Sequence, residues 1–213
     1  MSMTAQNVLG WAAGEIGYTR WDDPEEGSKY GRWYAQKHGA YYGTSGVPFC
    51  AMGASWCATD EEKNSVLPGG DFAYVPYGIN AAAREGQLVS PMTQAAPGDL
   101  VCFDWDDDGI ADHVGIVEAN YGSWLQTIEF NTSSGVAGSQ SNGGGVWRRT
   151  RDWSAVCAVI RPHYGGATTA EGYTDITALQ AAVGAATDNV IGPDTTKRIY
   201  AVVAASSWGG RQF

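Results

Sequence analysis

The sequence changes its pattern near Pro97, and this change constrains the fold more than any other feature. Before Pro97, apolar and small residues recur at helical spacing in several segments; after it, short apolar runs alternate with turns rich in Gly, Ser and Asn. A helical half followed by several short strands is typical of an α+β domain. We therefore predict an α+β fold.

The expected elements follow from this pattern. A first helix is predicted within residues 4–17, where Gly17 can end it, and a second from about Cys50. The polar, aromatic stretch 18–46 between them is predicted to be a loop. A short helix is expected around residues 79–84, and strands are expected at residues 100–103, 113–119, 124–130, 145–149 and 155–161.

The chain has 213 residues, which suits one domain of ordinary size and a smaller appendage. A stretch rich in Gly, Ala and Thr at residues 165–173 predicts a linker between a domain at 1–164 and a module at 174–213. In the module, Leu179 and Val183 share one face of an expected helix. Because this module is short, we expect further residues or a partner to complete its fold.

Charge excludes several classes of partner. The net charge of −10 and the pI near 4.6 argue against binding to nucleic acid or to anionic membrane surfaces, which require a clustered basic face. No apolar run approaches the roughly 20 residues that span a bilayer. Residues 1–18 lack a basic leader and a continuous apolar core, so we expect no signal peptide.

The four cysteines include no C-x-x-C pair, so they predict neither a zinc site nor a dense disulfide scaffold. We interpret Cys57, Cys102 and Cys157 as small buried apolar residues. Cys50 differs because it follows Pro48 where a helix is expected to begin. Free backbone N–H groups and the helix dipole stabilise a thiolate at that position.

A catalytic cysteine requires a base, and the chain offers three histidines. His113 opens an expected strand directly after an acidic loop, whereas His38 and His163 suit surface or packing positions. The sequence does not show whether His113 and Cys50 meet. A buried Cys50 with a merely structural His113 is therefore the alternative at this point.

The acidic loop repeats the start of an EF-hand. Asp104, Asp106 and Asp108 alternate before Gly109, but the glutamate that closes an EF-hand would fall at Gly115 and is absent. Two interpretations stay open: a calcium site formed by the three carboxylates, and a solvated acidic turn. If calcium binds, it would brace the loop that presents His113.

Three motifs stand out: residues 48–51 (Pro-Phe-Cys-Ala), residues 97–101 (Pro-Gly-Asp-Leu-Val) and residues 112–117 (Asp-His-Val-Gly-Ile-Val). In order and spacing they resemble the CHAP family of cysteine- and histidine-dependent amidohydrolases and peptidases. The resemblance covers roughly residues 4–164. It implies a papain-like fold, with N-terminal helices packed on an antiparallel sheet.

The resemblance also implies a set of site residues. Cys50 would be the nucleophile and His113 its base, and the acidic residue and Asn that the family places on the next strand match Glu129 and Asn131. One of these two should hydrogen-bond the His113 ring. Where the family often has Gly, this chain has Phe130, whose side chain should point to the opposite face.

The implied activity is hydrolysis of an amide bond in bacterial peptidoglycan, with no required cofactor. Some CHAP lysins bind calcium, which favours the metal interpretation of the acidic loop.

Residues 175–180 and 187–195 are similar to a peptidoglycan-binding helical domain, with Asn189 in place of the usual Gly. The combination resembles a phage endolysin, made in the host cytoplasm and acting on the wall after release.

Two other interpretations remain. A bacterial autolysin or a phage tail-associated hydrolase would use the same chemistry. A non-catalytic protein that binds wall glycans would instead stack its aromatic residues on sugars and keep Cys50 merely buried. In an enzyme, the Tyr- and Trp-rich stretch 30–42 could either pack locally or line the substrate groove.

Overall fold

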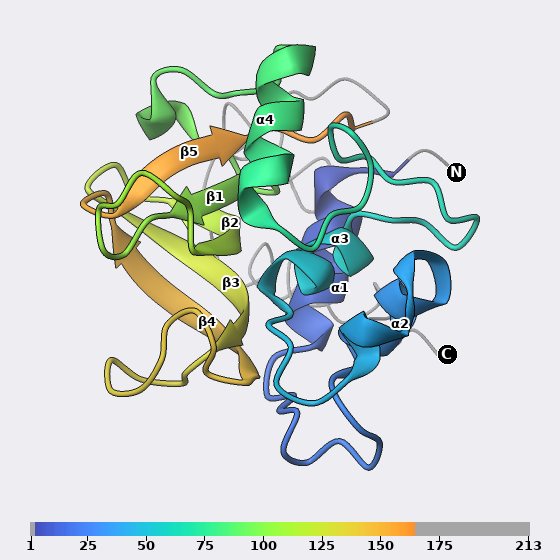
Figure 1. The fold of residues 1–213 in the computed structure, drawn as a ribbon. Coiled ribbons are helices and arrows are strands. Elements are labelled where there is room, and N and C mark those ends of the chain that lie inside the picture. The colour runs from blue at the N-terminus through green and yellow to red at the C-terminus, as the bar shows by residue number, and fades with distance from the viewer. Residues whose placement is uncertain (1–2, 165–213) are drawn as a thin grey trace, which may run out of the picture. The chain divides into compact units, whose positions relative to one another are not determined.

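The computed structural model describes residues 3–164, which fold into a layer of helices beside a five-stranded antiparallel sheet (Figure 1). This confirms the predicted α+β class and the papain-like arrangement. The helices are α1 (Ala5–Gly14), α2 (Lys29–His38), α3 (Cys50–Cys57) and α4 (Val75–Glu85), with short 3-10 turns at Ala40–Gly43 and Met92–Gln94. The strands are β1 (Leu100–Phe103), β2 (His113–Asn120), β3 (Trp124–Thr132), β4 (Gly145–Asp152) and β5 (Val156–Ile160).

The strands lie in the order β4-β3-β2-β1-β5, and each neighbouring pair is antiparallel. Helix α3 is central, because it contacts α1 and α2 as well as β2 and β3. All of its residues are buried, from Cys50 to Cys57. A short helix without a polar face can be stable only in such a position.

The two faces of the sheet follow from the alternation of side chains along each strand. Val114, Ile128 and Phe130 belong to the core that packs on the helices. Phe103 and Val117 belong to a second, smaller core on the opposite face. The strand that carries His113 therefore contributes to both cores.

Helix α2 corrects the prediction of a loop over residues 18–46. Its start is fixed by Ser28, whose hydroxyl accepts a hydrogen bond from the backbone N–H of Gly31 at 3.0 Å, and it ends at Gly39, where φ is +111°. Tyr30 and Tyr34, one turn apart, are buried. Aliphatic spacing did not predict this helix, because its large buried side chains are tyrosines rather than aliphatic residues.

Tyr30 also explains how α2 is held against α1. Its hydroxyl donates a hydrogen bond of 2.5 Å to Glu15, just after α1, and its ring packs edge-on against Phe130 with the ring centroids 4.9 Å apart. Lys29 forms an ion pair with the same carboxylate. These contacts connect the N-terminal helices to β3 across the core.

The predicted strands all form, with ends that differ by a few residues. The largest extension is in β4, which continues to Asp152 instead of ending at Arg149. No helix within residues 3–164 is long and apolar enough to cross a membrane. The predicted linker and the predicted C-terminal module lie outside the described residues.

Candidate active site

Cys50 is the first residue of α3, as the sequence predicts, and only 5% of its surface is exposed. Phe49 occupies the N-cap position and makes no side-chain hydrogen bond to the helix. The backbone N–H groups of the first turn are therefore left without a side-chain cap. The Cys50 sulfur lies at the positive end of the helix dipole.

His113 is the first residue of β2, and its side chain is fully buried. It lies opposite Phe103 in the register of β1 and β2, and its ring is flanked by Phe103 and Trp105 at centroid distances of 6.0 and 6.2 Å. Nε2 lies 3.0 Å from Oε2 of Glu129. The other ring nitrogen, Nδ1, is buried without a well-formed hydrogen bond to any residue between 3 and 164.

Cys50 and Glu129 together decide the charge of His113. Burial lowers the pKa of the ring, but the thiol of Cys50 and the hydrogen bond and charge of Glu129 outweigh burial and raise the pKa to about 9. At neutral pH the ring is therefore protonated. A protonated imidazole beside a thiol favours the thiolate by charge attraction.

Glu129 is held ionised in the interior. Burial raises the pKa of its carboxyl, but hydrogen bonds from Arg151 and His113 outweigh burial and lower the pKa to about 2. Arg151 donates to both carboxylate oxygens, and the hydroxyl of Thr127 donates to Oε1 at 2.7 Å. A buried carboxylate with this many donors keeps a fixed orientation.

The glycine at residue 115 makes room for Glu129. The two residues lie opposite each other in the register of β2 and β3, and a Cβ atom at Gly115 would lie 2.7 Å from Cγ of Glu129. Real Cβ atoms do not approach a neighbour that closely, so Glu129 would have to move. The position of Gly two residues after His113 therefore has a physical reason in this fold.

Asn131 is not a hydrogen-bond partner of the His113 ring. It adopts a left-handed conformation with φ of +60°, at an irregularity in the pairing of β3 with β4. Its Nδ2 donates to the carbonyl of Ser141 at 2.8 Å and to Asn142 at 3.2 Å, and its Oδ1 is buried without a partner among the described residues. Of the two predicted partners, Glu129 is the one that bonds His113.

Phe130 points away from Glu129, as the sequence predicts. Its ring packs on the helix side of the sheet, against Gly53 of α3 and Tyr30 of α2. Phe130 therefore leaves the His113 side of the strand unobstructed.

Sequence reasoning missed three residues of this network: Thr127, Arg151 and Trp105. Thr127 lies on β3, the same strand as Glu129. Arg151 lies on the neighbouring strand β4, in the part that extends beyond the predicted strand. An arginine on a strand next to a buried acid could have indicated an ion pair. Predicting that pair from the sequence would have required the register of β3 and β4.

The remaining cysteines differ in exposure, and the remaining histidines pair with carboxylates. Cys57 and Cys102 are buried, as predicted, whereas Cys157 is exposed on the edge strand β5 and corrects the prediction that it is buried. His38 bonds Asp71 at 2.7 Å and His163 bonds Glu85 at 2.7 Å.

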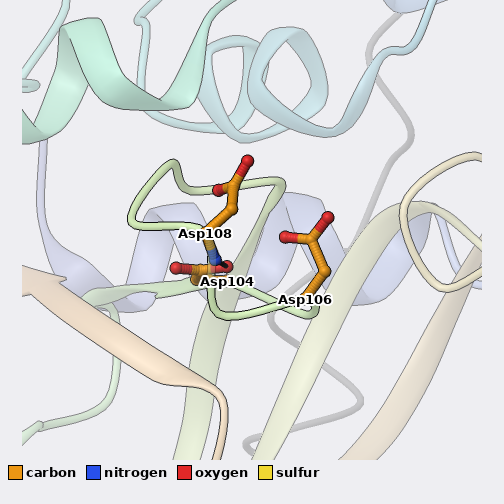
Figure 2. Close-up of side chains that lie close together, drawn as sticks. All are labelled: Asp104, Asp106 and Asp108. Atoms are coloured by element: carbon orange, nitrogen blue, oxygen red, sulfur yellow. Dashed lines mark hydrogen bonds between the residues drawn. The ribbon is translucent and has the colours of Figure 1, made fainter.

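The acidic loop brings its three carboxylates together. Figure 2 shows Asp104, Asp106 and Asp108 on one turn, and their nearest ligand oxygens all lie within 4.8 Å of one another. The charge of Asp108 is the main cause that raises the pKa of Asp106. Asp104 also accepts backbone N–H bonds from Asp108 and Gly109, which close the turn. Carboxylate oxygens in this arrangement fit a hard cation such as Ca²⁺.

A cavity of about 210 Å³ opens beside α2. It is lined by one indole ring and by amide, ammonium, hydroxyl and carboxylate groups from Trp33, Gln36, Lys37, Thr59, Lys63 and Asp71. Lys37 is paired with Asp71 at 2.8 Å. The cavity combines a flat apolar surface with polar groups of both signs.

The sequence was also compared with known protein families and with curated protein sequences. No curated protein sequence matches the chain. The CHAP domain family matches residues 40–131, a segment that begins before Cys50, includes His113 and Glu129 and ends at Asn131. Residues 40–131 therefore match a CHAP domain, and Cys50 and His113 both lie within the matched segment.

Proposed function

We propose that this protein hydrolyses an amide bond of bacterial peptidoglycan, with Cys50 as nucleophile and His113 as general acid and base. The observation that carries the proposal is the position of His113 between the thiol of Cys50 and the ionised carboxylate of Glu129, within a segment that matches the CHAP domain. CHAP domains act as amidohydrolases and peptidases on peptidoglycan, so the chemistry of the pair and the family agree.

The reaction follows from the charges of the pair. The Cys50 thiolate attacks the carbonyl carbon, and the C–N bond breaks as the His113 imidazolium gives its proton to the leaving nitrogen. His113, now neutral, takes a proton from water, whose oxygen attacks the thioester. Release of the acid regenerates the thiolate and the imidazolium.

Two features support the transition state. The uncapped backbone N–H groups at the start of α3 can donate hydrogen bonds to the oxyanion that forms on the carbonyl oxygen. Glu129 orients the ring through Nε2 and stabilises its positive charge, which leaves Nδ1 for the thiol and the leaving group. Asn131 is proposed to hold the backbone after Phe130 and so to support Glu129 indirectly.

We further propose that the protein is a phage endolysin that reaches the wall after release from the host cytoplasm. The likeness of residues 174–213 to peptidoglycan-binding modules supports this role, since a wall-binding module raises the local concentration of the enzyme at its substrate. The bond is either the amide next to N-acetylmuramic acid or a peptide bond of the stem or cross-bridge. An autolysin would share this chemistry.

Calcium binding to Asp104, Asp106 and Asp108 is a separate proposal. It is supported by the convergence of their oxygens within 4.8 Å on the loop that leads into β2. A bound ion would neutralise the repulsion that raises the pKa of Asp106. Its expected role is to brace the loop before His113.

A second candidate function is glycan binding without catalysis. The cavity beside Trp33 favours it, because an aromatic ring surrounded by amide, hydroxyl and charged groups suits the flat face and hydroxyls of a sugar. In this alternative, Cys50→Ala leaves wall binding unchanged and Trp33→Ala weakens it.

One experiment separates the two functions. Wild type, Cys50→Ala and the control Cys157→Ala are incubated with purified Gram-positive peptidoglycan, and turbidity and new amine ends are measured, the latter by mass spectrometry. Clearing by wild type and Cys157→Ala alone supports the hydrolase and identifies the bond. Clearing by Cys50→Ala contradicts Cys50 as nucleophile, and retention on the wall without clearing favours the binding protein.

A further inference from the structure

We propose that Arg151 is a positioning residue for the catalytic pair: it fixes Glu129 in the orientation and charge state that hold His113 ready for reaction. This inference rests on the proposed function and deepens it. It concerns a residue of β4, beyond the segment that matches the CHAP domain, which ends at Asn131.

The geometry of the contact is bidentate. Nε of Arg151 donates to Oε1 of Glu129 at 2.8 Å, and Nη2 donates to Oε2 at 2.6 Å. Oε2 is also the oxygen that bonds His113. Because two parallel bonds fix both the position and the rotation of a carboxylate, the direction of the Glu129–His113 bond is set from β4.

Arg151 is itself held in place. Only 11% of its side chain is exposed, and its guanidinium carbon lies 4.9 Å from the centroid of the Trp105 ring. Nη1 donates to Oε1 of Gln140 at 2.9 Å, and the same oxygen accepts a bond from Arg149 at 3.0 Å. The arginine therefore has a stacking partner on one side and a polar anchor in the loop after β3.

The charges around Glu129 explain why this arginine is needed. The carboxylate faces His113 from β2 and two arginines from β4, Arg151 by direct bonds and Arg149 by charge. His113 in turn faces the thiol of Cys50 from α3. Without Arg151, a fully buried carboxylate would keep only the bonds from His113 and Thr127 and the indirect charge of Arg149, and burial would favour its neutral form.

The functional consequence is a pH effect. A neutral Glu129 no longer stabilises the imidazolium, and the thiolate of Cys50 loses its partner. In wild type the low pKa of Glu129 places this loss in strong acid. Removing the Arg151 charge should raise the pH at which Glu129 becomes neutral by about one unit or more, since an adjacent arginine lowers a carboxyl pKa by about 1–3 units.

The test measures the rate at which iodoacetamide alkylates Cys50 in the full chain from about pH 2 to about pH 9, by mass spectrometry of the Cys50 peptide. The variants are Arg151→Met, Arg151→Lys and a matched control, Arg148→Met. Arg148 lies on the same strand and its substitution removes an ion pair with Glu118, but 46% of its side chain is exposed and its side-chain hydrogen bonds go to Glu118 rather than to Glu129.

We expect the acid midpoint of alkylation to rise in Arg151→Met and to stay at the wild-type value in Arg148→Met. Arg151→Lys should give a smaller rise, because an ammonium keeps the charge but cannot make both bonds. If Arg151→Met does not fold, Arg151→Lys decides. A midpoint equal to wild type in a folded Arg151 variant overturns the proposal.

Alkylation needs no peptidoglycan, so the two proposals can fail separately. A wild type with a rapidly alkylated Cys50 that leaves every wall preparation intact contradicts the hydrolase and not the role of Arg151. Hydrolysis that depends on Cys50, together with identical acid midpoints in all variants, contradicts the role of Arg151 and not the hydrolase.

Discussion

Gly53 of α3 and Phe130 of β3 are in direct contact, and the Phe130 ring occupies the space that a side chain at residue 53 would fill. Gly53 lies three residues after Cys50, and Phe130 is the neighbour of Glu129. The contact therefore sets the distance between the helix that carries Cys50 and the strand that carries Glu129.

Gly53→Ala should lower both stability and the reactivity of Cys50. The new methyl group would overlap the Phe130 ring, and overpacking of this kind costs about 1–3 kcal/mol, more than the roughly 1 kcal/mol that alanine gains over glycine in a helix. Urea unfolding and the alkylation rate of Cys50 measure the two effects. Gly14→Ala is the control, because nothing lies within 4 Å of a Cβ at Gly14; equal stability of the two variants would contradict the prediction.

Gly115→Ala should reduce activity with a smaller effect on stability. A Cβ at this position would lie 2.7 Å from Cγ of Glu129 and push the carboxylate away from His113. We expect hydrolysis of peptidoglycan to fall by about tenfold or more, which corresponds to about 1.4 kcal/mol of activation free energy. Wild-type activity in a folded Gly115→Ala variant would show that Glu129 tolerates the displacement.

Stability should fall as the pH rises above neutral. The pKa of His113 is raised from its ordinary 6.5 to about 9 in the folded state, so its protonation stabilises the fold fully below about pH 6.5 and this contribution is lost as the pH rises through about 9. The loss should be on the order of 3 kcal/mol, since one pKa unit corresponds to about 1.4 kcal/mol.

Urea unfolding at a series of pH values measures this loss. His113→Gln should flatten the pH dependence in that window, and Cys50→Ser should reduce it, because the thiol contributes to the raised pKa. The same slope in wild type and His113→Gln would assign the titration to other groups.

Calcium should raise the melting temperature of the wild type. A ligand that binds only the folded state stabilises it by about 2.7 kcal/mol at a free concentration of about 100 times its Kd. Asp106→Asn removes one of the three converging carboxylates and should abolish the shift, while Mg²⁺, which demands a tighter octahedral site, should give little. An unchanged melting temperature at about 10 mM calcium, well above the Kd of weak extracellular sites, would leave the loop as a solvated acidic turn.

The positions of Cys50 and His113 could be predicted because each depends on a local pattern. A proline before small residues marked the start of a helix, and an apolar run after an acidic loop marked the start of a strand. Helix α2 could not be predicted from aliphatic spacing, because its buried residues are Tyr30 and Tyr34 and its partners lie on other elements.

The residues that hold Glu129 in place could not be predicted without the register of the sheet. Glu129 faces Gly115 on one side and approaches Arg151 on the other only because of how β3 pairs with β2 and β4. Asn131 shows the converse: strict alternation predicts that it shares a face with Glu129, but its left-handed backbone and the irregular pairing after Glu129 redirect its amide to the Ser141 turn.

The proposed base His113, the carboxylate of Glu129 and Arg151 lie on three adjacent strands, β2, β3 and β4, whereas the proposed nucleophile Cys50 lies in the helical layer. A chain whose sheet has formed but whose helix α3 has not docked therefore has His113 beside Glu129 and no thiol beside it. The proposed acyl transfer requires both layers to be packed together. On this mechanism a chain without a docked α3 is inactive, and the rate at which Cys50 becomes reactive during refolding measures the docking of α3.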